Sequence, residues 1–120
     1  GVKVATISAG LSILADKVTR ELGLDFSVAN ELTVKDGRLT GDIVVKVGYD
    51  NKGKVLRSLL QELSLERSQC AAVGDDLPHI GLFQESGMAI AFNPRDPAVE
   101  RAAHAVVRGE DLRLILPHLT

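Results

Sequence analysis

The sequence predicts an α/β protein built on a doubly wound parallel sheet. Short apolar runs typical of buried strands, such as Cys70 to Val73 and Met88 to Phe92, alternate with segments whose apolar residues recur at helical spacing. Strands that alternate with helices favour parallel pairing, with helices on both faces of the sheet. With 120 residues, the chain is expected to form one domain, residues 1–120, long enough to bury a core.

The first predicted elements are a strand, a turn and a helix. Val2 to Ile7 is rich in β-branched residues and leads into Ser8-Ala9-Gly10. Apolar residues then recur at helical spacing as far as Leu22, and Gly23 stands where a glycine would end the helix. Ser8 has two interpretations at this turn. It caps the first free N–H groups of the helix, or it faces an anion held at the helix N-terminus.

A β-hairpin is predicted at about residues 31–47. Asp25 to Ala29 resembles a short strand, and two further β-rich runs flank Lys35-Asp36-Gly37-Arg38. Asp-Gly between such runs favours a tight hairpin, because glycine accepts the positive φ that these turns require. We expect the hairpin to project from one end of the sheet.

The next predicted element is a helix capped by Asp50 or Asn51. Its apolar residues share one face (Val55, Leu56, Leu59, Leu60 and Leu63). Lys52 lies in the first turn, where a cation opposes the helix dipole. A lysine in this unfavourable place either has a function or is simply solvated.

The candidate site follows the predicted strand Cys70 to Val73. Gly74-Asp75-Asp76 ends this strand, and a helical pattern begins at about Leu77. Open α/β sheets usually bind ligands at the carboxyl ends of their strands, and paired carboxylates are suitable ligands for Mg²⁺. The alternative is that Asp76 only caps the helix, with Pro78 in its first turn.

The remaining elements complete the alternation. The sequence predicts a helix ending near Gly87, a strand at Met88 to Phe92 and a short helix starting at Asp96-Pro97. A brief strand at Ala105 to Val107 and a closing helix from about Leu112 to Leu119 follow.

Composition narrows the function classes. The net charge is -2 without a block of like charge, which argues against a charge-driven nucleic-acid or anionic-membrane partner. Cys70 is the only cysteine, so the chain has no internal disulfide and no cysteine metal cluster. No apolar stretch is as long as a membrane span and no signal peptide is recognised. We therefore expect a cytoplasmic protein.

Four motifs in order resemble those of the haloacid dehalogenase superfamily of phosphatases, and most closely its phosphoserine phosphatase-like branch. They are Ile7-Ser8-Ala9-Gly10, Ala29-Asn30-Glu31-Leu32 with the hairpin after it, Asn51-Lys52-Gly53-Lys54, and Val73-Gly74-Asp75. The resemblance implies a Rossmann-like core, a hairpin that covers the site, and a Mg²⁺-dependent phosphomonoesterase. The implied mechanism proceeds through an aspartyl-phosphate, with a phosphoserine-like small molecule as substrate.

The resemblance also implies roles for individual residues. Ser8 would hydrogen-bond the transferring phosphoryl group, and Lys52 would neutralise its oxygens. Asp75 would bind Mg²⁺, with Asp76 in support. Further contacts to the phosphate are expected from three neighbours in the matched motifs: Ala9, Gly10 and Asn30.

Two features depart from the family pattern. The family's nucleophile lies in an Asp-x-Asp-x-Thr/Val motif on a strand before the serine motif, and neither that motif nor the helical cap after it occurs in this sequence. We therefore expect an incomplete core, whose unpaired sheet edge favours a homodimer. Pro78-His79 stands where the family has Asn-Asp or a similar acid. His79 is expected to coordinate a softer metal or to hydrogen-bond outward, and His104 and His118 are interpreted as structural.

The sequence therefore predicts the C-terminal core of a Mg²⁺-dependent phosphatase that is inactive as these 120 residues, because covalent catalysis needs a nucleophile. Two alternatives stay open. Pro78 and His79 favour a non-catalytic phosphate-binding or assembly domain. Gly74-Asp75-Asp76-Leu77-Pro78 also resembles the capless phosphatases that act on phosphorylated sugar acids.

Overall fold

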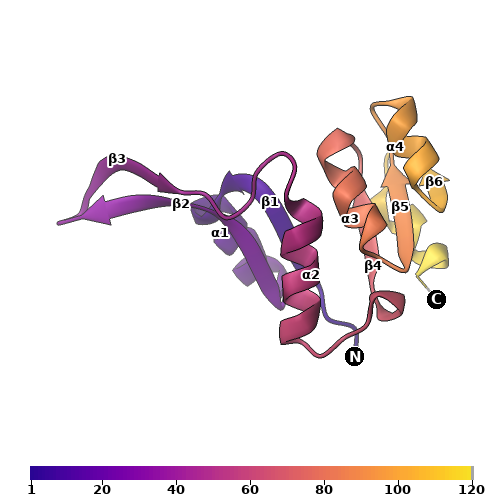
Figure 1. The fold of residues 1–120 in the computed structure, drawn as a ribbon, viewed down its shortest axis with the longest axis horizontal. Coiled ribbons are helices and arrows are strands. Elements are labelled where there is room, and N and C mark those ends of the chain that lie inside the picture. The colour runs from indigo at the N-terminus through magenta and orange to yellow at the C-terminus, as the bar shows by residue number, and fades with distance from the viewer. Residues whose placement is uncertain (120) are drawn as a thin grey trace. The chain divides into compact units, whose positions relative to one another are not determined.

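The computed structural model describes residues 1–119 and divides into two compact units, Gly1–Tyr49 and Asp50–Thr120. Each unit contains its own three-stranded sheet within the described residues (Figure 1). Strands and helices alternate along the chain, so the predicted α/β class is confirmed. Among residues 1–119, no helix is both long enough and apolar enough to span a bilayer.

The first unit consists of β1 (Ala5–Leu11), α1 (Ser12–Leu22), β2 (Phe26–Lys35) and β3 (Arg38–Val44). β1 pairs with β2 in parallel, and β2 pairs with β3 in antiparallel orientation. The predicted helix end at Gly23 is confirmed, because this residue has φ 67°. The predicted hairpin is confirmed as well. Asp36 and Gly37 both have positive φ, 52° and 75°, as the tightest hairpin turns require.

The turn predicted at Ser8 is wrong, because the strand does not end there. β1 continues to Leu11, and the pairing register with β2 shifts between Ile7 and Leu11. Three residues of β1, Ser8 to Gly10, therefore lie opposite the single residue Ala29. The segment is a bulge in a strand and the helix begins only at Ser12, because a bulge takes up extra residues without ending the strand.

A single long strand, β2, replaces the short strand predicted at residues 25–29 and the separate β-rich run predicted before Lys35. Asn30, at its centre, is buried with 6% of its surface exposed. Its amide nitrogen donates to the carbonyl oxygens of Ala9 and Val47, each at 2.9 Å. Its Oδ1 accepts from the backbone nitrogens of Lys46 at 2.7 Å and Val47 at 2.9 Å. The side chain therefore ties β2 to β1 and to the segment after β3.

The second unit contains α2 (Lys52–Glu62), β4 (Ala71–Gly74), α3 (Ile80–Gln84), β5 (Met88–Phe92), α4 (Pro97–Ala102) and β6 (Ala105–Val107). Short 3₁₀ turns occupy Arg67–Gln69, Leu77–His79 and Leu112–His118. The strand order is β4-β5-β6 and both pairings are parallel. The predicted strands at 88–92 and 105–107 are confirmed, and so is the helix start at Asp96, whose Oδ1 accepts from the Ala98 nitrogen at 2.7 Å.

The central strand β5 is buried on both faces. Ile90 packs with Val107 and Ile115 on one side, together with the partly buried Met88 and Phe92. The intervening alanines of β5 are fully buried and point to the opposite face, where α3 and α4 contact the strand. This double burial explains why the strand reads as an uninterrupted apolar run.

α2 and α3 approach each other closely at two glycines. A Cβ atom on Gly53 would lie 2.7 Å from the Gly81 carbonyl oxygen, and one on Gly81 would lie 3.2 Å from the Gly53 nitrogen. This backbone contact places the N-terminus of α2, where Lys52 lies, next to the start of α3. Any side chain at Gly53 would push the two helices apart.

We expect Gly53→Ala to lower the free energy of unfolding by about 1–3 kcal/mol, because overpacking outweighs the gain in helix propensity. Urea unfolding followed by circular dichroism measures this change. Ser58→Ala on the exposed face of α2 is the control and should change stability by less than about 0.5 kcal/mol. A stabilised Gly53→Ala variant would contradict the close contact.

Candidate functional site

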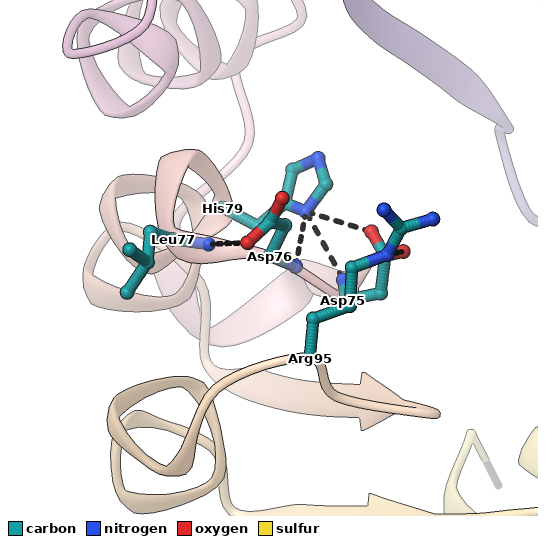
Figure 2. Close-up of polar contacts among 5 residues, drawn as sticks. All are labelled: Asp75, Asp76, Leu77, His79 and Arg95. Atoms are coloured by element: carbon teal, nitrogen blue, oxygen red, sulfur yellow. Dashed lines mark hydrogen bonds and ion pairs between the residues drawn. The ribbon is translucent and has the colours of Figure 1, made fainter.

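The loop after β4 carries both predicted acids. Asp75 and Asp76 directly follow Gly74, the last residue of β4, at the edge of the sheet where ligands are expected. Asp76 Oδ1 accepts a hydrogen bond from the Leu77 nitrogen at 2.8 Å (Figure 2). Pro78 lies in the first turn of the 3₁₀ helix that follows. The capping role considered for Asp76 is therefore confirmed.

His79 turns inward onto this loop. Its Nδ1 accepts hydrogen bonds from the backbone nitrogens of Asp75 at 3.0 Å and Asp76 at 3.1 Å (Figure 2). The expectation that His79 hydrogen-bonds outward is thus wrong for Nδ1. An imidazole nitrogen that accepts two N–H groups carries no proton, so the ring is neutral with its hydrogen on Nε2. Burial, and next the charge of Lys52, lower the pKa of His79, while Asp75 and Asp76 oppose the shift.

The contact of His79 Nδ1 with Asp75 Oδ1, at 3.3 Å, is therefore not an ion pair. Both atoms are acceptors, and a neutral nitrogen offers the carboxylate no charge. The backbone hydrogen bonds hold the two groups together. The Asp75 carboxylate takes its countercharge from elsewhere.

Arg95 supplies that charge, and sequence reasoning missed it. Its Nε lies 3.2 Å from Asp75 Oδ2 (Figure 2). Its backbone nitrogen donates to the Asp75 carbonyl oxygen at 2.8 Å. Arg95 follows β5, the strand next to β4 in the parallel sheet. The loops after adjacent parallel strands meet at one edge, so its position after the strand Met88–Phe92 was the available signal.

A cavity of about 420 Å³ opens beside these loops. Its apolar part is formed by Val73, Phe92 and Leu112, and its polar part by Gly74, Asp75, Asn93 and Arg95. Asn93 has φ 47°, and its side chain exchanges two hydrogen bonds with the backbone of Gly109 (2.8 and 3.1 Å). The loop that carries Arg95 is therefore held firmly at its start.

Lys52 is the first residue of α2 and is buried, with 6% of its surface exposed. Among residues 1–119, no carboxylate lies within ion-pair distance of its ammonium group. Burial lowers the pKa of Lys52, and the charge of Asp75 only partly opposes this. A cation at a helix N-terminus is also disfavoured by the helix dipole. An anion bound beside Lys52 would offset all three penalties.

The other predicted phosphate contacts lie in the first unit. Ser8 is half-buried, and its Oγ accepts a hydrogen bond from the Gly10 nitrogen at 3.0 Å. It therefore caps the bulge in β1, not the first turn of α1. Ala9 and Gly10 are exposed, and the side chain of Asn30 already makes four backbone hydrogen bonds. Roles for these four residues in phosphate binding stay predictions.

The second unit brings Asp75, Asp76 and His79 together, with Lys52 in electrostatic range. Among the described residues, no group of three or more His, Cys, Asp or Glu side chains could enclose a metal ion. Mg²⁺ does not require such a cage, because it is usually held by one or two carboxylates, water and substrate phosphate. Asp75, with 40% of its side chain exposed, fits this mode of binding, and a bound cation would compete with Arg95 for Oδ2.

Comparison with known proteins supports the family resemblance. A family of haloacid dehalogenase-like hydrolases matches residues 27–111. The chain is 37% identical over 120 residues to a phosphoserine phosphatase of Methanocaldococcus jannaschii. The aligned region covers 99% of this chain and 56% of that protein. This chain thus spans about half the length of that relative.

Solved structures give the same result. A phosphoserine phosphatase in apo form matches with a TM-score of 0.86 and 35% identity, over 98% of this chain and 58% of that one. A phospho-aspartyl intermediate analogue of phosphoserine phosphatase matches with a TM-score of 0.85 and 35% identity, over 98% of this chain and 56% of that one.

Proposed function

Because the chain belongs to the haloacid dehalogenase-like hydrolases, we propose that it forms the phosphate-binding core of a Mg²⁺-dependent phosphomonoesterase. The substrate is phosphoserine or a similarly small phosphorylated compound. Identity of 35–37% to phosphoserine phosphatases supports this substrate class. The phospho-aspartyl analogue among these relatives supports an aspartyl-phosphate mechanism for the complete enzyme.

One observation carries the proposal: the side chain of Lys52 is buried, and among residues 1–119 its ammonium group has no ion pair. A buried cation without an ion pair lowers stability, and such a group is retained when a ligand supplies the missing charge. A phosphate dianion is a suitable ligand, because charge-assisted hydrogen bonds from lysine to phosphate are strong. The position of Lys52 next to the Gly53–Gly81 contact also holds it close to the loop after β4.

Different residues of this chain are proposed to have different roles in phosphoryl transfer. Lys52 stabilises negative charge on the phosphoryl oxygens, since this reaction depends mainly on positioning and charge stabilisation. Asp75 holds Mg²⁺, which when bound supplies further charge neutralisation. Asp76 caps the following turn and keeps the loop in place. Ser8, Ala9, Gly10 and Asn30 of the first unit are proposed to bind phosphate, as the family resemblance implies.

We expect the 120-residue chain to bind phosphate but not to hydrolyse phosphoserine, because its sequence has no Asp-x-Asp motif ahead of Ser8. The measurement is phosphate release from phosphoserine with Mg²⁺, beside binding of inorganic phosphate by calorimetry. Release should equal the buffer blank, and binding should be about 10- to 100-fold weaker in Lys52→Met. Release that disappears in Asp75→Ala would refute the predicted inactivity, and undetectable phosphate binding would refute the proposed function.

The free edge of β4 supports a proposed homodimer. Among residues 1–119, β4 pairs only with β5, and Ala71-Ala72-Val73 contains neither the charges nor the proline that usually protect an edge strand. We expect concentration-dependent association in sedimentation experiments. Introducing a charge by Ala71→Lys, at an exposed position, should weaken it. A wild-type protein that stays monomeric at high concentration would contradict this prediction.

The same proposal includes a cytoplasmic location. Cys70 is a free thiol, and burial raises its pKa, which keeps it protonated and unreactive. A protein that relies on packing without disulfides is suited to a reducing compartment.

A further inference from the structure

We propose that His79 is a positioning residue for this site: its Nδ1 holds the backbone of Asp75 and Asp76 and so fixes the Asp75 carboxylate for its ligands. The inference rests on the proposed function, because it concerns the same phosphate site. The family usually has a carboxylate at this position, and a carboxylate could accept these hydrogen bonds only by adding a negative charge to the site.

The two hydrogen bonds converge on one atom. The backbone nitrogens of Asp75 and Asp76 lie 3.0 and 3.1 Å from His79 Nδ1 (Figure 2). Successive backbone N–H groups that point to one place form a site normally filled by an anion. His79 fills it with a neutral acceptor. The loop is therefore satisfied by its own chain and needs no bound ion to keep its shape.

Gly74 fixes the orientation of the ring. A Cβ atom on Gly74 would lie 2.5 Å from His79 Cβ, 2.6 Å from its Cγ and 2.9 Å from its Nδ1. The imidazole thus lies directly against the end of β4, with 21% of its side chain exposed. Only a residue without a side chain fits beneath it. Gly74 and His79 therefore act together, because the glycine leaves the space that the imidazole occupies.

The neutral acceptor also sets the charge of the site. Asp75 and Asp76 carry two negative charges, and Lys52 and Arg95 carry two positive charges. A carboxylate at position 79 would make this sum negative and would repel a phosphate dianion. His79 satisfies the same backbone donors without that repulsion. Since one ring nitrogen accepts hydrogen bonds and the other carries the proton, neither has a lone pair for a metal.

The test uses the full 120-residue chain, labelled with ¹⁵N, and two matched variants. His79→Asn places its Oδ1 where Nδ1 lies and preserves the acceptor, whereas His79→Gln reaches only to the position of Nε2. Three quantities are measured: the imidazole tautomer from long-range ¹⁵N spectra, hydrogen exchange of the Asp75 and Asp76 amides, and affinity for inorganic phosphate.

We expect the Nε2–H tautomer in the wild type, with His79→Asn within about twofold of it in exchange and affinity. In His79→Gln, exchange of both amides should rise about tenfold and phosphate affinity should fall by about the same factor. An Nδ1–H tautomer, or equal exchange in the two variants, would overturn the inference. If His79→Gln does not fold, the tautomer of the wild type and the amide exchange and phosphate affinity of His79→Asn still test the inference. Unchanged phosphate affinity with lost protection overturns only the positioning role, whereas no phosphate binding by the wild type overturns the proposed function itself.

Discussion

Lys52→Met is expected to lower the affinity of the chain for phosphate by about 10- to 100-fold, the loss of a charge-assisted hydrogen bond at a buried site. The same substitution should raise the free energy of unfolding by about 1 kcal/mol, because methionine fills a similar volume without the desolvation of an ammonium group. Calorimetric titration with inorganic phosphate and urea unfolding measure the two effects. Opposite signs for binding and stability are the mark of a functional residue.

Lys54→Met is the matched control, since Lys54 is exposed on the same helix two residues away. It should leave affinity within about twofold and stability within about 0.5 kcal/mol. Loss of stability in Lys52→Met, or equal loss of affinity in both variants, would contradict the role given to Lys52. The first result would mean that the ammonium group is satisfied in the unliganded protein. The second would mean that phosphate responds only to overall charge.

The pH dependence follows from the same group. Burial lowers the pKa of Lys52 below its ordinary value of 10.5, and only the protonated lysine binds a phosphate dianion. Affinity should therefore fall as pH rises through the lowered pKa, and the decline should begin well before pH 10.5. Measurements above about pH 8.5 avoid the titration of inorganic phosphate, whose second proton is lost at about pH 7, later than that of a phosphate monoester. Lys52→Met should show no such decline.

Local patterns in the sequence were sufficient for most elements of the second unit. The strands at 88–92 and 105–107, and the helix capped by Asp96, each depend on residues that are neighbours in the chain. Periodicity and capping report such contacts directly. In the first unit the same reasoning failed at Ser8, because a bulge arises from pairing with another strand.

The site was predictable only in part for the same reason. Asp75 and Lys52 were proposed as site residues from their positions at a strand end and a helix start, which are local features. Arg95 reaches Asp75 from the next loop in space, 20 positions further along the sequence. The role of His79 depends on which ring nitrogen carries the proton, and that follows only from hydrogen-bond geometry. Contacts across the fold decide both.

Asn30→Leu is expected to cost about 2–4 kcal/mol of stability, because it removes the side-chain partner of four backbone groups, two in buried and two in partly buried hydrogen bonds. Two are carbonyl oxygens, of Ala9 and Val47, and two are nitrogens, of Lys46 and Val47. Total stability is commonly only about 5–15 kcal/mol, so the variant should lose the order of residues 1–49. Urea unfolding combined with amide exchange of β2 measures this.

Thr40→Val is the control, since Thr40 makes its two hydrogen bonds in an exposed part of the hairpin. It should cost less than about 1 kcal/mol. A similarly small cost for Asn30→Leu would show that water reaches the orphaned groups. Asn30→Asp keeps the acceptor oxygen and removes both donors. The loss of phosphate binding free energy in that variant can be compared with its loss of unfolding free energy. If the first does not exceed the second, Asn30 acts by holding β1 and β2 in place and not by touching the ligand.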